Sequence, residues 1–189
     1  MTDKAVRAPV SLGGMDIEGF QMPDGSYRMS QTQAALAVGK DEINARRFLD
    51  SRGIKTLLGK GYTPDTIEVE STGQVRGQGR INALPLEVVT AFWVWQCSQG
   101  NKQAIALVMA LATETLDRRF DTAFGVSRTE GEYNQRLSDR VERLQGDLDR
   151  LGEAYAENDD RLERISRLED QVRRLGEEPE QIPHQQSED

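Results

Sequence analysis

Apolar residues recur at alternating steps of four and three through the last third of the chain, and this spacing limits the possible folds more than any other feature. A helix with that spacing carries a narrow apolar seam, which becomes stable in water when it packs against another helix. We therefore predict a coiled coil over residues 127–178, through which copies of the chain bind one another. The predicted oligomerisation residues are Leu137, Val141, Leu144, Leu148, Leu151, Tyr155, Leu162 and Ile165.

Two irregularities make this seam uneven. After Ile165 the next apolar residue comes only three positions on, at Leu168, so the heptad frame slips. Four glycines each weaken the helix by about 1 kcal/mol, so pairing between chains is expected to supply much of its stability. We expect the pairing to hold best from Leu137 to Tyr155. Residues 179–189 are predicted to be a disordered acidic tail.

The excess of acidic over basic side chains is confined to this same C-terminal third. The net charge of −8 argues at first against a nucleic-acid ligand. However, residues 1–126 contain 14 basic and 14 acidic side chains, whereas residues 127–189 contain 10 and 18. Within the neutral part, residues 40–80 carry eight basic side chains against six acidic ones. The low isoelectric point is therefore compatible with a local basic surface on the N-terminal domain.

The N-terminal two thirds contain the turn signals of a small folded domain. Residues 1–14 show little periodicity and are predicted to be a flexible arm, which leaves a globular domain over residues 15–126. A turn at residues 23–26 predicts a β-hairpin, because its proline and glycine suit the central turn positions. The predicted fold class is α+β: a small, mostly helical domain with β-hairpins, of helix-turn-helix or winged type, followed by the coiled coil.

Helices are predicted where apolar residues recur with helical spacing between capping residues. Capping signals begin two short helices, over residues 31–38 and 42–52. Gly53 is expected to end the second, and a loop to follow it. Two longer helices are predicted near residues 85–100 and 102–122. The last of these should be the buried centre of the domain, because its first half has almost no polar side chains.

Residues that carry catalysis or bind a metal are scarce. The single histidine, His184, lies in the predicted tail, and the single cysteine, Cys97, lies in an aromatic run where a buried thiol is expected. We therefore predict no metal, no cofactor and no enzymatic activity; an enzyme acting on nucleic acid would need a metal site that the sequence does not show. With neither a secretory signal nor a membrane span, the protein is expected to be cytoplasmic, with no membrane partner.

The second short helix and a glycine-rich hairpin contain the candidate DNA contacts. In a helix-turn-helix, a small residue lets two helices approach, a glycine makes the turn, and the second helix enters the major groove. Ala35, Gly39 and residues 42–52 supply these parts. Residues 66–83 predict a hairpin whose arginines bracket glycines, as in a wing that approaches phosphates. The candidates are Asn44, Arg46, Arg47 and Ser51 on the helix, and Arg76, Gln78 and Arg80 on the hairpin.

The alternative is an ordinary helix pair and a surface loop whose charges serve only solubility. Against it stands a likeness in element order to a known family. A short hairpin, the helix pair SQTQAALAVGKDEINARRFLDSR, the hairpin GQVRGQGRINALP and then helices rich in Trp and Ala resemble the KilA-N and Bro-N type domains of phage antirepressors and mobile-element regulators. The likeness covers roughly residues 15–124, and the C-terminal extension also resembles antirepressor layout. It implies DNA binding by the N-terminal domain.

We therefore expect an oligomeric, DNA-binding regulator of transcription or of a phage or mobile element, associated with the nucleoid if it binds duplex DNA. Pairing of the stalk would add weak contacts together through effective concentration. The alternative hypothesis is a protein-binding adaptor or antirepressor that captures another protein through the domain or the acidic coiled coil. The sequence leaves both hypotheses open.

Overall fold

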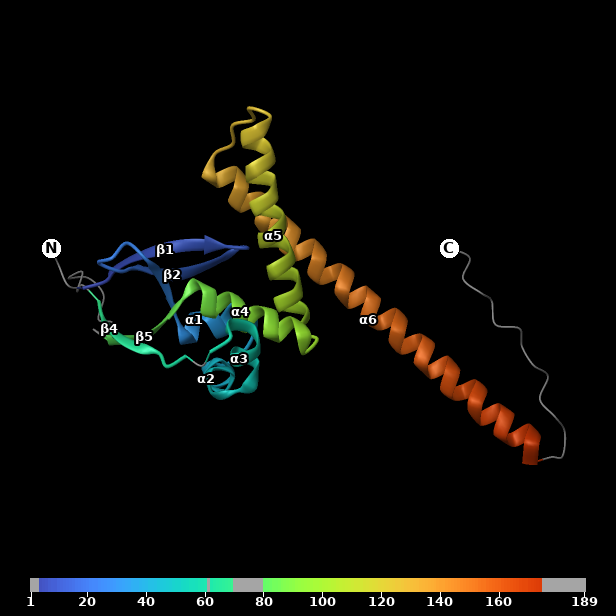
Figure 1. Cartoon of the computed structure of the whole chain (residues 1–189). Coiled ribbons are helices and arrows are strands. Elements are labelled where there is room, and N and C mark those ends of the chain that lie inside the picture. The colour runs from blue at the N-terminus through green and yellow to red at the C-terminus, as the bar shows by residue number, and fades with distance from the viewer. Residues whose placement is uncertain (1–3, 61, 70–79, 175–189) are drawn as a thin grey trace. The chain divides into compact units, whose positions relative to one another are not determined.

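The computed structural model describes residues 4–60, 62–69 and 80–174, and its strands form one antiparallel sheet in the order β1-β2-β3-β5-β4 (Figure 1). The predicted α+β class is confirmed, as are the hairpin of β2 and β3 and the hairpin of β4 and β5. The strands are β1 Val6–Leu12, β2 Met15–Gln21, β3 Tyr27–Ser30, β4 Asp65–Glu68 and β5 Arg80–Pro85. The helices are α1 Gln31–Leu36, α2 Glu42–Asp50, α3 Arg52–Leu58, α4 Leu86–Ser98, α5 Lys102–Ala123 and α6 Glu130–Arg174.

The chain divides into two compact units, Met1–Gly146 and Asp147–Asp189. The first unit holds the sheet, the first five helices and the first turns of α6, and the second holds the rest of α6. The boundary predicted at residue 126 therefore comes too early, because the first turns of α6 belong to the folded domain.

The segment predicted to be a flexible arm forms a strand instead. β1 pairs with β2 from Val6 to Leu12, and Gly13 and Gly14, with φ of 59° and 83°, make the two-residue turn between them. A hairpin turn with positive φ at both positions matches the twist of the strands, and glycine adopts it without strain. The sequence does contain the signals, since apolar residues alternate along β1 and a Gly-Gly pair follows it.

The sheet curls until the start of β1 meets the end of β4. Ala5 and Val69 form a parallel bridge, and the Ala5 amide donates a hydrogen bond of 3.0 Å to the Glu68 carbonyl. Figure 1 shows these two segments side by side. A small apolar cluster that includes Phe20 and Ala83 fills the inner side of the curl. β4 is therefore held on both sides, by β5 and by the start of the chain.

The main core lies on the other face of the sheet and is centred on α4. This helix contacts α3 and α5 as well as β3 and β5. Val88 and Phe92 are fully buried, and the indole Nε1 of Trp93 donates a buried hydrogen bond of 2.8 Å to the Ala34 carbonyl in α1. Because a hydrogen bond depends on angle as well as distance, this buried bond fixes how α1 is oriented on α4. The short helices after β3 are therefore anchored to α4.

Part of the segment predicted to be a loop after the second short helix folds as a third helix. α2 ends at Asp50, and Ser51 is extended, with its Oγ accepting a hydrogen bond of 3.0 Å from the Gly53 amide, so it caps α3. Gly53 therefore does not end a helix. A Cβ there would lie 2.9 Å from the ring of Trp95, so glycine allows α3 to pack closely on α4. Sequence periodicity could not show this, because Trp95 belongs to a distant segment.

α5 is buried along one side only, which corrects the expectation that it forms the buried centre. Ala104, Leu107 and Ala110 are fully buried, whereas Met109 and Leu116 are more than half exposed. A helix that is apolar all round is usually covered all round. In the part of the chain that the structure describes, no helix is long and apolar enough to cross a membrane.

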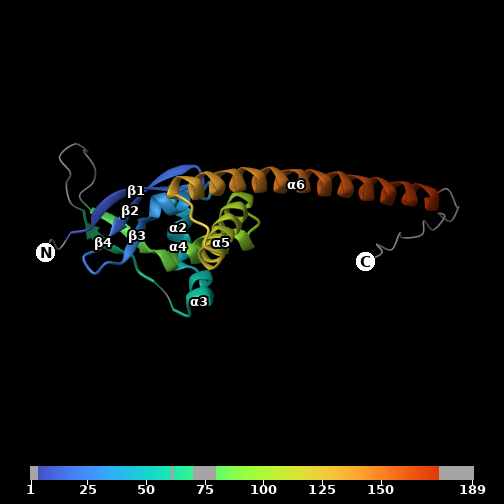
Figure 2. The same ribbon diagram turned by 90° about the horizontal axis from the view of Figure 1, so that it is seen from above.

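The first turns of α6 pack onto the domain, beside the turn between β1 and β2 (Figure 2). Leu137 and Val141 are only 2% and 7% exposed and join the main core, and Leu144 packs partly against it. This corrects the expectation that the proximal half of the seam is free to pair between chains. A heptad pattern shows which side of a helix is buried but not what covers it.

The second unit continues α6 to Arg174. Along it Leu151, Leu162 and Leu168 are more than half exposed, Ile165 is somewhat less so and Leu148 is half-buried. Tyr155 belongs to the same helix. This distal part of the predicted seam therefore carries exposed apolar side chains, and its pairing with another chain stays a prediction.

A polar network attaches α6 to α5. Arg118 donates hydrogen bonds of 2.7 and 3.1 Å to the carboxylate of Glu130 and one of 2.8 Å to Glu114, which raise the pKa of Arg118. Its guanidinium lies 4.0 Å from the ring centre of Tyr133. The Tyr133 hydroxyl donates to Asp121 at 2.9 Å, and burial together with this bond raises the pKa of Tyr133.

We expect the attachment of α6 to weaken in acid. The hydrogen bond from Arg118 lowers the pKa of Glu130 from its ordinary value of 4.5, so the folded protein binds this proton less tightly than the unfolded chain. The stabilisation is therefore fully present above about pH 4.5 and is lost as the pH falls through the lower pKa of the folded state. Because the pair is largely exposed, its effect should not exceed about 1 kcal/mol.

Thermal unfolding followed by circular dichroism across an acidic pH series measures this effect. The Glu130→Gln variant should lack that part of the acid dependence, because an amide does not titrate. The same acid dependence in both proteins would show that the pair contributes nothing.

Candidate nucleic-acid interface

α1 and α2 form a closely packed helix pair. Ala34 and Ala35 in α1 are fully buried, and their small side chains allow the two helices to approach. Gly39, with φ of 64°, turns the chain, and the Lys40 amide donates to the Ala35 carbonyl at 3.0 Å. A Cβ at Gly39 would lie 2.4 Å from the flexible end of the Gln103 side chain, so the positive φ is the main reason for glycine here. The predicted helix-turn-helix parts therefore lie together.

An aromatic cluster holds the inner face of α2. Phe48 is fully buried, and its ring centre lies 5.6 Å from that of Phe92 and 5.4 Å from that of Trp95, both in α4. Residues three and four positions apart share one face of a helix, so burial of this face leaves the opposite one in solvent. That outer face of α2 consists of Ile43, Arg46, Arg47 and Asp50, which are all exposed.

Two of the candidate residues around this helix bind neighbouring backbone. The side-chain amide of Asn44 donates to the Asp41 carbonyl at 3.2 Å. Ser51 accepts from the Gly53 amide and also donates to the Phe48 carbonyl at 2.7 Å. Each side chain satisfies a backbone group at a helix end, as Asn and Ser commonly do. Their polar character is thus explained without a ligand.

The two arginines of α2 differ in their partners. Arg46 pairs with Glu42 at 3.3 Å, and Glu42 also accepts a hydrogen bond of 2.8 Å from Thr32. Arg47 is exposed and forms no ion pair with any residue that the structure describes. A carboxylate beside Arg46 repels a phosphate, whereas nothing comparable is paired with Arg47. Arg47 is therefore the arginine of this helix that is most available to a ligand.

α3 adds basic side chains that sequence analysis missed. Arg52 and Lys55 are exposed on α3, and Lys60 is exposed just after it. The chain has no acidic residue from Ser51 to Pro64, so these charges are not neutralised locally along the chain. This run of basic residues is the available signal. The prediction places Arg52 at the end of the second helix and Lys60 in a loop, and it names neither as a contact.

The candidate residues of the glycine-rich hairpin are placed only in part. Arg76 and Gln78 lie outside the described residues. Arg80 is the first residue of β5, where its backbone pairs in register with that of Glu68 in β4. The structure therefore confirms the pairing of β4 with β5, and the positions of the candidate side chains on this hairpin lie outside what it describes.

A polar hollow of about 310 Å³ lies between the start of α2 and β5. Its lining includes Glu42 from α2, Asn82 from β5 and Glu18 from β2. Glu18 pairs with Arg7 at 3.2 Å. Two carboxylates make this hollow unfavourable for a phosphate, so a DNA backbone bound to α2 would follow its arginine face instead.

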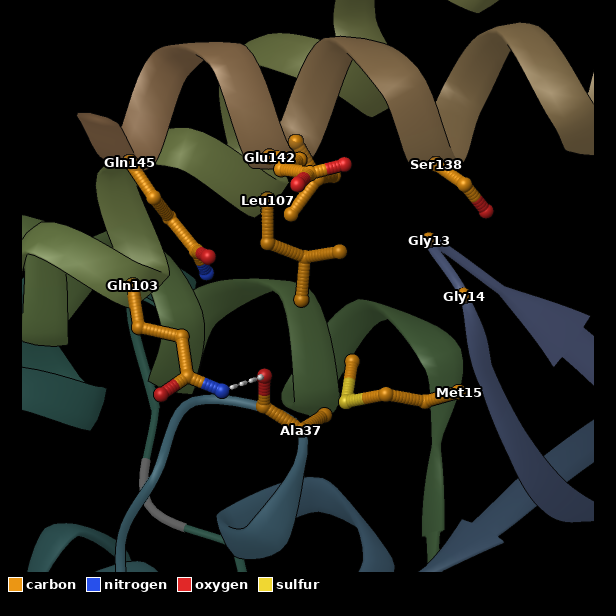
Figure 3. A pocket seen from close by; sticks show the side chains of 10 residues that line it. Gly13, Gly14, Met15, Ala37, Gln103, Leu107, Ser138, Glu142 and Gln145 are labelled. Carbon is orange, nitrogen blue, oxygen red and sulfur yellow. Dashed lines mark hydrogen bonds between the residues drawn. The ribbon is translucent and has the colours of Figure 1, made fainter. Parts of the chain in front are cut away.

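A second hollow of about 320 Å³ lies where the turn between β1 and β2 meets α5 and α6 (Figure 3). Gln103 and Gln145 extend into the same side of it, and the Gln103 amide donates to the Ala37 carbonyl at 3.3 Å. Its lining contains one carboxylate, Glu142, and neither cysteine nor histidine. These groups form hydrogen bonds but do not make a nucleophile and base pair.

The described residues contain no cluster of side chains that could act as a nucleophile or bind a metal ion. Burial raises the pKa of the Cys97 thiol, which disfavours the thiolate that a nucleophile or metal ligand needs. No three His, Cys, Asp or Glu side chains that the structure describes lie close enough together to hold a metal ion. His184 lies outside the described residues.

Comparison with known proteins adds no family. No family model matches the chain, and no curated protein or solved structure is significantly similar to it. The resemblance to KilA-N and Bro-N type domains therefore stays a prediction that rests on the order of elements.

Proposed function

We propose that the chain is an oligomeric DNA-binding protein that regulates transcription or serves a phage or mobile element. The observation that carries the proposal is the outer face of α2, where Arg46 and Arg47 stand exposed on a helix held by α1 and α4. Rigid support matters because a helix reads a groove only when its side chains keep a fixed position. The proposal names α2 as the helix that enters the major groove.

The basic residues divide into two expected roles. Arg47 is suited to a phosphate or to the O6 and N7 atoms of guanine, since its guanidinium forms no ion pair with any residue that the structure describes. Arg52 and Lys55 on α3 are suited to phosphates, which orient a protein without reading sequence. Arg76, Gln78 and Arg80 on the hairpin are proposed as the second contact. Contact of Arg47 with guanine would give specificity. The phosphate contacts of the other basic residues would give affinity.

Oligomerisation compensates for the modest charge of the domain. Its 14 basic and 14 acidic residues predict weak attraction of one domain to DNA. Linking two domains makes the second contact intramolecular, which raises the overall affinity without new contacts.

The test is binding of the full chain to labelled duplex DNA, followed by fluorescence anisotropy over a salt series. Affinity should fall steeply with salt, and Arg47→Ala should lower it and reduce the slope of log K against log salt by about 0.9 for each phosphate that is no longer bound. Glu42→Gln should have the opposite effect at low salt, because it removes the carboxylate beside Arg46 and keeps an acceptor for Thr32.

The matched control is Arg143→Ala, which removes an exposed arginine from α6. It should leave both affinity and slope unchanged. Absence of salt-dependent binding by the unaltered protein would refute the proposal. Equal reductions of affinity in the Arg47 and Arg143 variants would show that α2 is not the helix that contacts DNA.

A protein-binding adaptor is the second candidate, and the exposed apolar row in the second unit favours it. Leu151, Leu162 and Leu168 lie on an acidic helix that offers a seam to another helix. Pull-down after nuclease treatment distinguishes the two functions. A partner that resists nuclease and no longer binds when Leu162 and Leu168 are both replaced by aspartate would support the adaptor.

A further inference from the structure

The outward face of α5 carries a continuous apolar row in the first unit. Met109, Leu116 and Phe120 are 51%, 55% and 61% exposed, and the small residues Ala112 and Ala123 lie exposed between and beyond them. Steps of three and four residues keep side chains on one side of a helix. These five residues therefore form a single stripe, which we call the outer stripe.

The outer stripe faces away from everything that α5 is known to contact. The side chains by which α5 binds the first turns of α6 are Asp117, Arg118 and Asp121, which lie away from the stripe on the other side of the helix. Between Met109 and Ala123, Arg119 is the only charged residue next to the stripe on this side of α5. An apolar, nearly uncharged helix face of this kind is typical of an interface and unusual as a free surface.

The spacing of the stripe is symmetric about Leu116. Successive steps from Met109 to Ala123 are three, four, four and three residues. If a second α5 ran antiparallel with a two-fold axis at Leu116, Phe120 of one copy would face Ala112 of the other, and Met109 would face Ala123. Leu116 would face its own copy on the axis, and the other large side chains would each oppose a small one, an arrangement that fills an interface without voids.

A parallel pair would pack less well. It would place Phe120 against Phe120 and Ala112 against Ala112, so that crowded and empty layers would alternate. An antiparallel pair also satisfies the requirement that a two-fold interface be complementary to itself. The order of large and small residues therefore favours a second copy of this chain in the antiparallel orientation.

The exposed area is sufficient for a specific dimer. Together with the adjoining Phe124, the stripe exposes on the order of 500 Å² of mostly apolar surface on each chain, which is large for a patch on a monomer. Two such faces would bury on the order of 1,000 Å², which reaches the lower limit for a specific interface.

We propose that two copies of the chain bind each other through the outer stripe of α5, antiparallel and with the two-fold axis at Leu116. This surface lies within the folded domain and is separate from the distal seam of α6. It depends neither on DNA binding nor on pairing of the second unit.

Disulfide trapping in the full chain tests the proposal. In a Cys97→Ser background, Leu116→Cys places a thiol on the axis, where the two Cα atoms come within the roughly 7 Å that a disulfide needs. Mild oxidation should convert it to a covalent dimer at least about tenfold faster than the Thr115→Cys control, which is exposed on α5 beside the stripe. Equal rates would overturn the proposal, provided that circular dichroism shows both variants to be folded.

A mixing experiment tests the orientation. Met109→Cys and Ala123→Cys chains, one lengthened by a tag, should form mixed disulfides in preference to like pairs, because these positions face each other only in the antiparallel arrangement. A preference for like pairs would indicate parallel packing and would overturn the proposed geometry.

Discussion

Replacing Leu137 with alanine is expected to lower the free energy of unfolding of the first unit by about 2–5 kcal/mol. Leu137 is 2% exposed and joins the main core together with Val141. Removal of a buried leucine forfeits its transfer free energy and leaves a cavity that the surroundings fill only in part. Urea unfolding followed by the fluorescence of Trp93 and Trp95, which both lie in α4, measures the change.

Leu162→Ala is the matched control, because Leu162 is a leucine of the same apolar seam but is 60% exposed in the second unit. It should change the unfolding of the first unit by less than about 0.5 kcal/mol. Equal effects of the two substitutions would contradict a core role for Leu137. A destabilisation by Leu137→Ala that disappears at high protein concentration would instead favour pairing between chains through this residue.

Replacing Phe48 with alanine should be the most damaging change near the candidate interface. A buried phenylalanine typically contributes about 3–5 kcal/mol, and Phe48 also contacts the rings of Phe92 and Trp95. The substitution should free α2 from α4, so the proposed DNA affinity should fall although no arginine is removed. Urea unfolding and the anisotropy assay measure the two effects.

Ile43→Ala is the control for that experiment, because Ile43 lies on the exposed face of the same helix. It should change stability by no more than about 0.5 kcal/mol. If Phe48→Ala unfolds easily but binds DNA as tightly as the unaltered chain at a temperature where both are folded, α2 is not the contact.

Burial of the proximal part of the seam limits which residues of α6 can pair with another chain. Leu137 and Val141 hold α6 to its own domain, so pairing of the predicted coiled coil falls to the distal residues that begin near Leu148. The outer stripe of α5 offers a second, independent surface. Pairing through the outer stripe, as proposed, would set two helix pairs at a defined separation, which the proposed DNA binding requires.

Local features of the sequence were enough to predict much of the domain. Ser30 accepts a hydrogen bond of 3.1 Å from the Gln33 amide, as the capping box indicated, and Gly39 turns the chain into α2. Turn residues predicted the hairpin of β2 and β3 and the hairpin of β4 and β5. Helical spacing predicted that Arg46 and Arg47 lie on the outer face of their helix. Such signals are readable because the groups that interact lie within a few residues of one another.

What only the tertiary structure decided concerns partners that are distant along the chain. Gly53 could not be recognised as a contact with Trp95, because the two residues lie in segments far apart in the sequence. The sequence determined that α5 and α6 each carry an apolar stripe. The fold decided that Leu137 is covered by its own domain while Leu116 is left in solvent, because periodicity specifies which side of a helix is apolar and only packing specifies what covers it.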